Sequence, residues 1–226
     1  MKLINEDLNN EIVFEENKVN LLVIENKKKF VEFIQEIIKQ INGDEGKFSL
    51  FDKNTELKIH DKIDIIKDIF DLNVNNKKVL NKIYHELEEL SVDSEFLLET
   101  KNMESNLLKY IYCLIEKYDY PLEIMEGVDL KEIFKLLSVK LSLCFSNKIE
   151  EILEYIDLVS KVLKKEVFIL VNFHIFLEKD DIVALYRECF YKKIKLLFAE
   201  SQKPDIINEK EKLFIIDNDL CEINLS

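Results

Sequence analysis

Glycine and proline are nearly absent from this chain, which has only 3 glycines and 2 prolines in 226 residues. Few positions can therefore form tight turns or left-handed backbone, and this favours long helices. Apolar residues make up 47% and charged residues 34% of the chain, which is the balance of a globular protein and excludes a disordered one. The length suits one or two domains.

Arginine is also scarce, because Arg187 is the single arginine and every other basic residue is a lysine. Bidentate recognition of guanine edges favours arginine, so base-specific DNA recognition is not expected. The formal net charge is −13. Such a chain repels nucleic acid on average, but a local group of lysines can still bind it.

The four cysteines lie far apart and form no C-x-x-C pair, so we expect buried free thiols in a reducing compartment at Cys113, Cys144, Cys189 and Cys221. The segment Met1–Asn10 is polar and acidic, unlike a signal peptide. No apolar run approaches the ~20 residues of a membrane span. The sequence thus predicts a soluble, cytoplasmic protein without a membrane partner.

The first 60 residues favour strands and one helix. Apolar runs at 12–14 and 21–24 predict two strands, and a helix with one apolar face follows from about Lys27 to Asn42. The segment "NGDEG" places both of its glycines where that helix should stop. Residues 47–60 alternate apolar and polar side chains around a turn, which predicts a strand or hairpin.

From Asp61 the apolar spacing is helical for about a hundred residues, and the segments with this spacing include "IDIIKDIFDL" (63–72) and "DLKEIFKLLSVKL" (129–141). The last helix of this region carries an apolar stripe at Ile149, Ile152, Leu153, Ile156, Val159, Val162 and Leu163. After it, "EVFILV" (166–171), "IKLLFAE" (194–200) and "KLFIID" (212–217) predict buried strands, the third being the last of the chain. An amphipathic helix, "EKDDIVALYRECFYKK", lies between the first two, which implies a parallel crossover.

The predicted fold class is therefore α/β, a parallel-sheet head built from both chain ends with an inserted all-helical leg. The expected head spans residues 1–60 and 152–226, and the expected leg spans residues 61–151.

The chemistry of a nucleotide hydrolase is missing from this fold. The predicted strand-to-helix step is Glu25-Asn26-Lys27-Lys28-Lys29, without a glycine loop for phosphates. The strand "VFILVN" ends at Asn172, where a metal-binding Asp would be expected. The three histidines are isolated, so a zinc site is not expected. We predict no catalytic residue and no bound nucleotide.

Two segments carry a family resemblance. The first contains "LFD" (50–52), "DIFDLNVN" (68–75) and "KIYHELE" (82–88), and the second runs from a strand ending in Val-Asn through "FLEKDDIVAL" (176–185) to a Leu-Leu-Phe strand. In order, spacing and total length they resemble the CRISPR-associated adaptation protein of type II-A systems, the ring-forming Csn-two family, in its short branch. The resemblance covers essentially the whole chain.

This resemblance implies an α/β head like a nucleotide-binding fold that has lost its nucleotide motifs, with a helical leg inserted into it. It implies a homotetrameric ring, supported by calcium, that threads double-stranded DNA from free ends without sequence preference and without catalysis. The implied role is spacer acquisition in antiviral defence, alongside the CRISPR integrase proteins and the RNA-guided nuclease.

Candidate DNA-binding residues are the lysines in three basic segments, because phosphate binding needs clustered positive charge. No acidic residue occurs between Ile133 and Ile149, so the lysines in this segment form a positive island. The candidates are Lys27, Lys28, Lys29, Lys77, Lys78, Lys135, Lys140 and Lys148. For calcium, the segment "PLEIMEGVDLKE" offers oxygen ligands at Glu123, Glu126 and Asp129.

Two other interpretations remain open from the sequence. The chain could be a degenerate nucleotide hydrolase or a nuclease whose site has no familiar motif. It could also be a helical adaptor whose acidic surface binds basic proteins and not DNA. A salt titration of DNA binding distinguishes this case, because phosphate contacts give a steep salt dependence.

Overall fold

A computed structural model describes residues 1–125, 127–205 and 207–225 of the chain. It divides the chain into two compact units. The head unit comprises residues 1–74 and 144–226, and the leg unit comprises residues 75–143.

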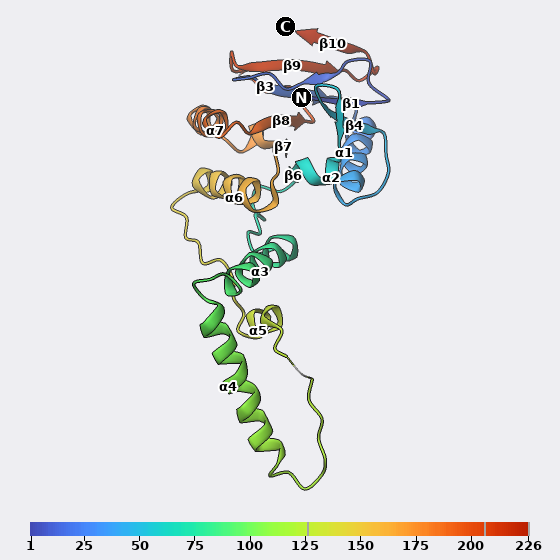
Figure 1. The fold of residues 1–226 in the computed structure, drawn as a ribbon. Coiled ribbons are helices and arrows are strands. Elements are labelled where there is room, and N and C mark those ends of the chain that lie inside the picture. The colour runs from blue at the N-terminus through green and yellow to red at the C-terminus, as the bar shows by residue number, and fades with distance from the viewer. Residues whose placement is uncertain (126, 206, 226) are drawn as a thin grey trace. The chain divides into compact units, whose positions relative to one another are not determined.

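The head unit contains a six-stranded sheet in the order β10-β9-β3-β8-β7-β6 (Figure 1). Its strands are β3 (Val19–Ile24), β6 (Ile63–Ile66), β7 (Val167–Val171), β8 (Lys195–Glu200), β9 (Glu211–Ile216) and β10 (Glu222–Leu225). All neighbours pair in parallel except β10, which is antiparallel to β9. Because β3 lies between β8 and β9, the sheet is built from both chain ends, which confirms the predicted α/β fold class.

A second, antiparallel sheet of the head unit has the order β2-β1-β4-β5. Its strands are β1 (Lys2–Asn5), β2 (Ile12–Val13), β4 (Phe48–Asp52) and β5 (Thr55–Leu57). Helix α1 (Lys27–Ile41) packs with both sheets in one apolar core, where the rings of Phe33 and Phe48 meet edge to face at 5.0 Å. Gly43, with φ of +103°, follows the helix as the sequence predicted.

The other face of the six-stranded sheet faces helix α7 (Lys179–Tyr191), which in turn contacts α6 (Lys148–Leu163) (Figure 1). Side chains alternate along a strand, so Leu197 packs in the core with α1 while its neighbour Phe198 meets Tyr186 of α7. Two short elements complete the unit: α2 (Ile59–Lys62) and a 3-10 turn, η1 (Phe173–Ile175), directly after β7.

The leg unit contains helices α3 (Lys77–Ser91), α4 (Leu97–Ile115) and α5 (Leu130–Leu136). Helix α3 packs on α5 and on the segment that follows it. The Tyr84 hydroxyl donates to the Val139 carbonyl at 2.7 Å, and the Lys131 ammonium pairs with Glu88 at 2.6 Å. Helix α4 buries none of its side chains.

The unit boundaries differ from the expected ones at both ends of the leg. We predicted a helix through "IDIIKDIFDL", but Ile63–Ile66 forms β6, which pairs in parallel with β7 and buries Ile63. At the other end, α6 belongs to the head unit because its apolar stripe is buried at Ile152, Ile156 and Val159. The leg is therefore shorter than residues 61–151.

Other local predictions need correction too. Helix α5 ends at Leu136, and Ser138 beyond it has a left-handed backbone, so the helix predicted through "LKEIFKLLSVKL" is short. The strand in "KLFIID" is not the last, because β10 follows it. Only Cys189 is buried, whereas Cys113, Cys144 and Cys221 are exposed, and all four are free. Within the described part of the chain, no helix is long and apolar enough to span a membrane.

Candidate functional site

The β3–α1 step is closed by an asparagine cap and not by a glycine loop. Asn26 lies two residues after the end of β3 and accepts a hydrogen bond from the Lys29 backbone N–H at 3.1 Å, which caps the helix. Its side-chain amide donates to the Asn218 carbonyl at 3.0 Å. The helix N-terminus thus uses a side chain of the protein where a nucleotide-binding loop would offer its N–H groups to phosphate.

The three lysines at this step differ in their surroundings. Lys27 and Lys28 are exposed, and Lys28 lies 3.8 Å from Glu32. Lys29 is largely covered and pairs with Asp7 at 3.1 Å. Hydrogen bonds from Lys47 and Lys29 lower the pKa of the Asp7 carboxyl, which holds it charged. Of the three, Lys29 is therefore engaged within the head unit, and Lys27 and Lys28 project outward.

The leg unit carries four of the candidate lysines. Lys77 and Lys78 open α3 and are exposed, and Lys140 is exposed after α5. No ion pair joins any of these three to a carboxylate among the described residues. Lys135 is also exposed, but it pairs with Glu132 at 2.6 Å, and this hydrogen bond raises the pKa of its ammonium.

The positive island of the sequence is divided between the two units. Lys135 and Lys140 belong to the leg unit, whereas Lys148 begins α6 of the head unit and pairs with Glu151. These three lysines are therefore close in sequence but do not form one surface within a single unit.

Of the three predicted calcium ligands, the structure describes Glu123 and Asp129. Asp129 caps α5, where its Oδ1 accepts from the backbone N–H groups of Lys131 and Glu132 at 2.9 and 3.2 Å. Glu123 is exposed, and Glu126 lies outside the described residues. Across the part of the chain that the structure describes, no group of three His, Cys, Asp or Glu side chains could hold a metal ion.

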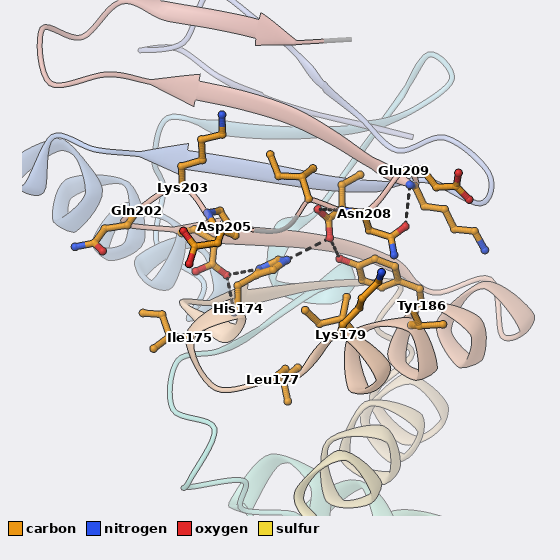
Figure 2. A pocket seen from close by; sticks show the side chains of 17 residues that line it. His174, Ile175, Leu177, Lys179, Tyr186, Gln202, Lys203, Asp205, Asn208 and Glu209 are labelled. Atoms are coloured by element: carbon orange, nitrogen blue, oxygen red, sulfur yellow. Dashed lines mark hydrogen bonds and ion pairs between the residues drawn. The ribbon is translucent and has the colours of Figure 1, made fainter.

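The structure instead builds a buried ionic cluster that the sequence did not indicate. His174, in η1, places its Nδ1 2.9 Å from Glu200 at the end of β8 and its Nε2 3.2 Å from Glu211 at the start of β9. The Tyr186 hydroxyl of α7 donates to Glu211. All three charged side chains are at most 5% exposed. Figure 2 shows His174 with an interaction on each side of its ring.

The carboxylates determine the charge of this histidine. Burial by itself lowers the pKa of His174, but hydrogen bonds and charges from Glu200 and Glu211 outweigh burial and raise it from 6.5 to about 9. At neutral pH the ring is an imidazolium that donates from both nitrogens. Burial, together with the Glu211 charge, raises the pKa of Tyr186 above its usual value, so this phenol keeps its proton.

Asn172 connects two of the segments that form the cluster. It has the left-handed backbone conformation, φ of 56°, which turns the chain from β7 into η1. Its side-chain oxygen accepts from the Ser201 N–H at 2.8 Å and joins the ends of β7 and β8. Part of the sequence signal was present, since Asn172 follows the buried strand β7 and Glu200 is the last residue of the buried strand β8. Polar residues at such ends meet at one edge of a parallel sheet.

A family model described as "CRISPR-associated protein (Cas_Csn2)" matches residues 40–220. The match covers most of the chain, from the end of α1 through β9, and so includes both units. The chain belongs to the Csn2 family. It is thus a CRISPR-associated protein linked to adaptation, as the resemblance of the sequence implied.

This Csn2-family chain also resembles a solved structure of an ATP-binding cassette of an ABC transporter in its ADP conformation. The two share 14% sequence identity with a TM-score of 0.44, over 95% of this chain and 83% of the other.

Proposed function

We propose that this protein is a non-enzymatic, cytoplasmic, double-stranded DNA-binding component of CRISPR spacer acquisition. In this proposal four copies close into a ring around DNA ends and act beside the CRISPR integrase proteins and the RNA-guided nuclease. Family membership supports the pathway, and features of each unit support the mode of action.

The observation that most directly supports assembly is the exposed apolar surface of α4. Met103, Leu107, Tyr110 and Leu114 follow one another at spacings of three and four residues, so they lie on one face of the helix, defined here as the α4 stripe. These side chains are 39% to 61% exposed. A helix with such a stripe and no buried residue is stabilised when it packs against another helix, and a second copy of the same leg offers one.

Exposed lysines support DNA binding. Lys27, Lys28, Lys77, Lys78 and Lys140 are exposed, and lysines bind phosphate as point charges without reading bases. One chain offers few such groups against a net charge of −13. In a ring of four copies, each lysine occurs four times around a shared axis. The rest of the protein surface is acidic and repels DNA from other positions.

The charge states of the buried cluster support a role without catalysis. At neutral pH His174 already holds its proton and Tyr186 keeps its own, so neither is ready to act as a general base. The capped β3–α1 step likewise lacks a phosphate loop. Incubation with ATP or duplex DNA and a divalent metal tests the alternative of a hydrolase or nuclease, which would produce turnover.

Calcium enters the proposal only through the family resemblance. Among the described residues no group of three His, Cys, Asp or Glu side chains could hold a metal ion, and we propose that the ion takes ligands from more than one chain of the ring. Glu123, Glu126 and Asp129 are the residues we assign to such a shared site.

Light scattering on a sizing column tests the assembly. We expect a particle of four times 26.9 kDa in calcium. A stable monomer in calcium would contradict the ring, and a tetramer that persists in chelator would remove calcium from the proposal.

A further inference from the structure

A second potential site lies in the head unit, where a cavity of about 820 Å³ opens beside the buried cluster. It lies between α7 and the described residues, 201–205 and 207–210, of the connection from β8 to β9 (Figure 2). Strands β8 and β9 run in the same direction on either side of β3, and such crossovers usually carry a helix. No helix forms in the described residues of this connection, so a loop covers the sheet there and leaves space beneath it.

The floor of the cavity carries unbalanced negative charge. Glu200 and Glu211 are two carboxylates with one imidazolium, His174, between them, and Tyr186 adds a hydrogen bond but no charge. The side chains of both glutamates are almost fully buried. A buried charge without a full counter-charge is costly, so this floor attracts a cation.

Part of the cavity wall is aliphatic, with side chains from η1, α7 and the connection at Ile175, Leu177, Ile182, Val183, Pro204 and Ile207. Asp205 stands at the exposed rim, where Figure 2 draws it on the same side of the cavity as His174. Three lysines also line the rim, but Lys179 and Lys203 are exposed to solvent and Lys210 lies over the Phe190 ring at 5.5 Å. Solvent screens these ammonium groups more than it screens the buried carboxylates.

These features favour an organic cation over a metal ion. Both nitrogens of His174 are bound to carboxylates, so the ring has no free lone pair for a metal. Both oxygens of Glu211 are bound within the protein, by His174, Tyr186 and the Asn208 N–H. An alkylammonium group would therefore approach Glu200 while its methylene chain packs against the aliphatic part of the wall. We propose that this cavity binds an aliphatic ammonium ligand, with Glu200 and Asp205 as its recognition residues.

Two sources supply this chemistry, a free polyamine or a lysine side chain of a partner protein. Calorimetric titration of the full-length protein at about 0.15 M salt, which screens non-specific attraction to an acidic surface, provides the test. The ligands are spermidine, N-acetyl-lysine methylamide and the uncharged 1,8-octanediol. We expect both amines to bind and the diol not to bind. Tighter binding of spermidine assigns the site to a polyamine, and tighter binding of the lysine derivative assigns it to a protein.

Matched variants localise the binding. Glu200→Gln keeps an acceptor for His174 but removes the charge, and we expect amine affinity to fall about tenfold or more. Asp205→Asn, at the exposed rim, does not depend on the buried cluster for folding and should weaken binding about threefold. Glu16→Gln removes the same charge from an exposed loop and should leave affinity unchanged. Absence of amine binding to the wild-type protein, or equal affinities for all three variants, would overturn the proposal.

Discussion

At the scale of single residues, His174 shows how burial and charge together decide what a side chain does. The same ring in water would be mostly neutral at pH 7, but two buried carboxylates keep it protonated to a pH of about 9. The cluster is consequently a structural ion network at neutral pH, and its charge makes stability depend on pH.

The first prediction concerns this pH dependence. The folded-state pKa of His174 is raised, so its contribution to stability is complete below pH 6.5 and is lost as pH rises through about 9. Between these limits the wild-type free energy of unfolding should fall by on the order of 3 kcal/mol because of this residue. His174→Asn should be less stable and lack this decline. Urea unfolding at a series of pH values measures both.

The matched control is His85→Asn, on an exposed position of α3 beside Glu88 and Glu89. It should retain the wild-type decline above pH 6.5. A His174→Asn profile parallel to that of the wild type would show that the histidine is not held charged by its two carboxylates.

The sequence could not reveal the pairing of His174 in this cluster, because its two carboxylate partners are distant along the chain. Glu200 and Glu211 lie 26 and 37 residues beyond His174, at no helical or strand spacing from it. We interpreted each histidine as isolated for that reason. The lysines are the opposite case, since Lys135, Lys140 and Lys148 are close in sequence but are divided between two units.

At the scale of elements, unbroken apolar runs were the reliable signal. Strands β3, β7 and β8 were predicted because each is an unbroken apolar run, as in a strand buried on both faces. Runs of this length are too short for a typical buried helix. Strand β6 was missed because "IDIIKDIFDL" also fits a helical period, and only its pairing with Val167–Leu170, a hundred residues later, makes it a strand. Strand β1 was missed because it lies in a polar, acidic segment.

Helix α4 gives the second prediction. Leu107→Gln places an amide in the α4 stripe and should lower the particle mass measured by light scattering, because a buried contact between legs would lose apolar area. Leu98→Gln is the control, since Leu98 is 71% exposed and nine residues from Leu107, on the opposite side of the helix. If both variants keep the wild-type mass, the stripe is not part of the assembly.

At the scale of the whole molecule, an acidic protein can hold DNA only if its few free lysines are concentrated by assembly. Counterion release then makes binding fall steeply with salt, with a slope of about 0.9 per phosphate contacted. This is the physical basis of the proposed role, because neither base recognition nor catalysis contributes to it.

The third prediction follows from that slope. Lys77→Gln with Lys78→Gln should weaken binding of linear duplex DNA and make its logarithmic salt dependence shallower, as measured by fluorescence anisotropy at several salt concentrations. The control pair, Lys53→Gln with Lys164→Gln, removes the same charge from exposed positions outside the candidate set. Equal loss of slope in both pairs would mean that net charge, and not a lysine-lined surface, governs binding.

The most direct test of a ring that encircles DNA compares two topologies of one duplex. A mobility-shift titration should use the same sequence as a linear fragment and as a covalently closed circle, at equal length and at about 0.15 M salt. Threading from free ends predicts that the assembled protein shifts the linear DNA and leaves the circle unshifted. Equal shifts of both forms would contradict the encircling ring.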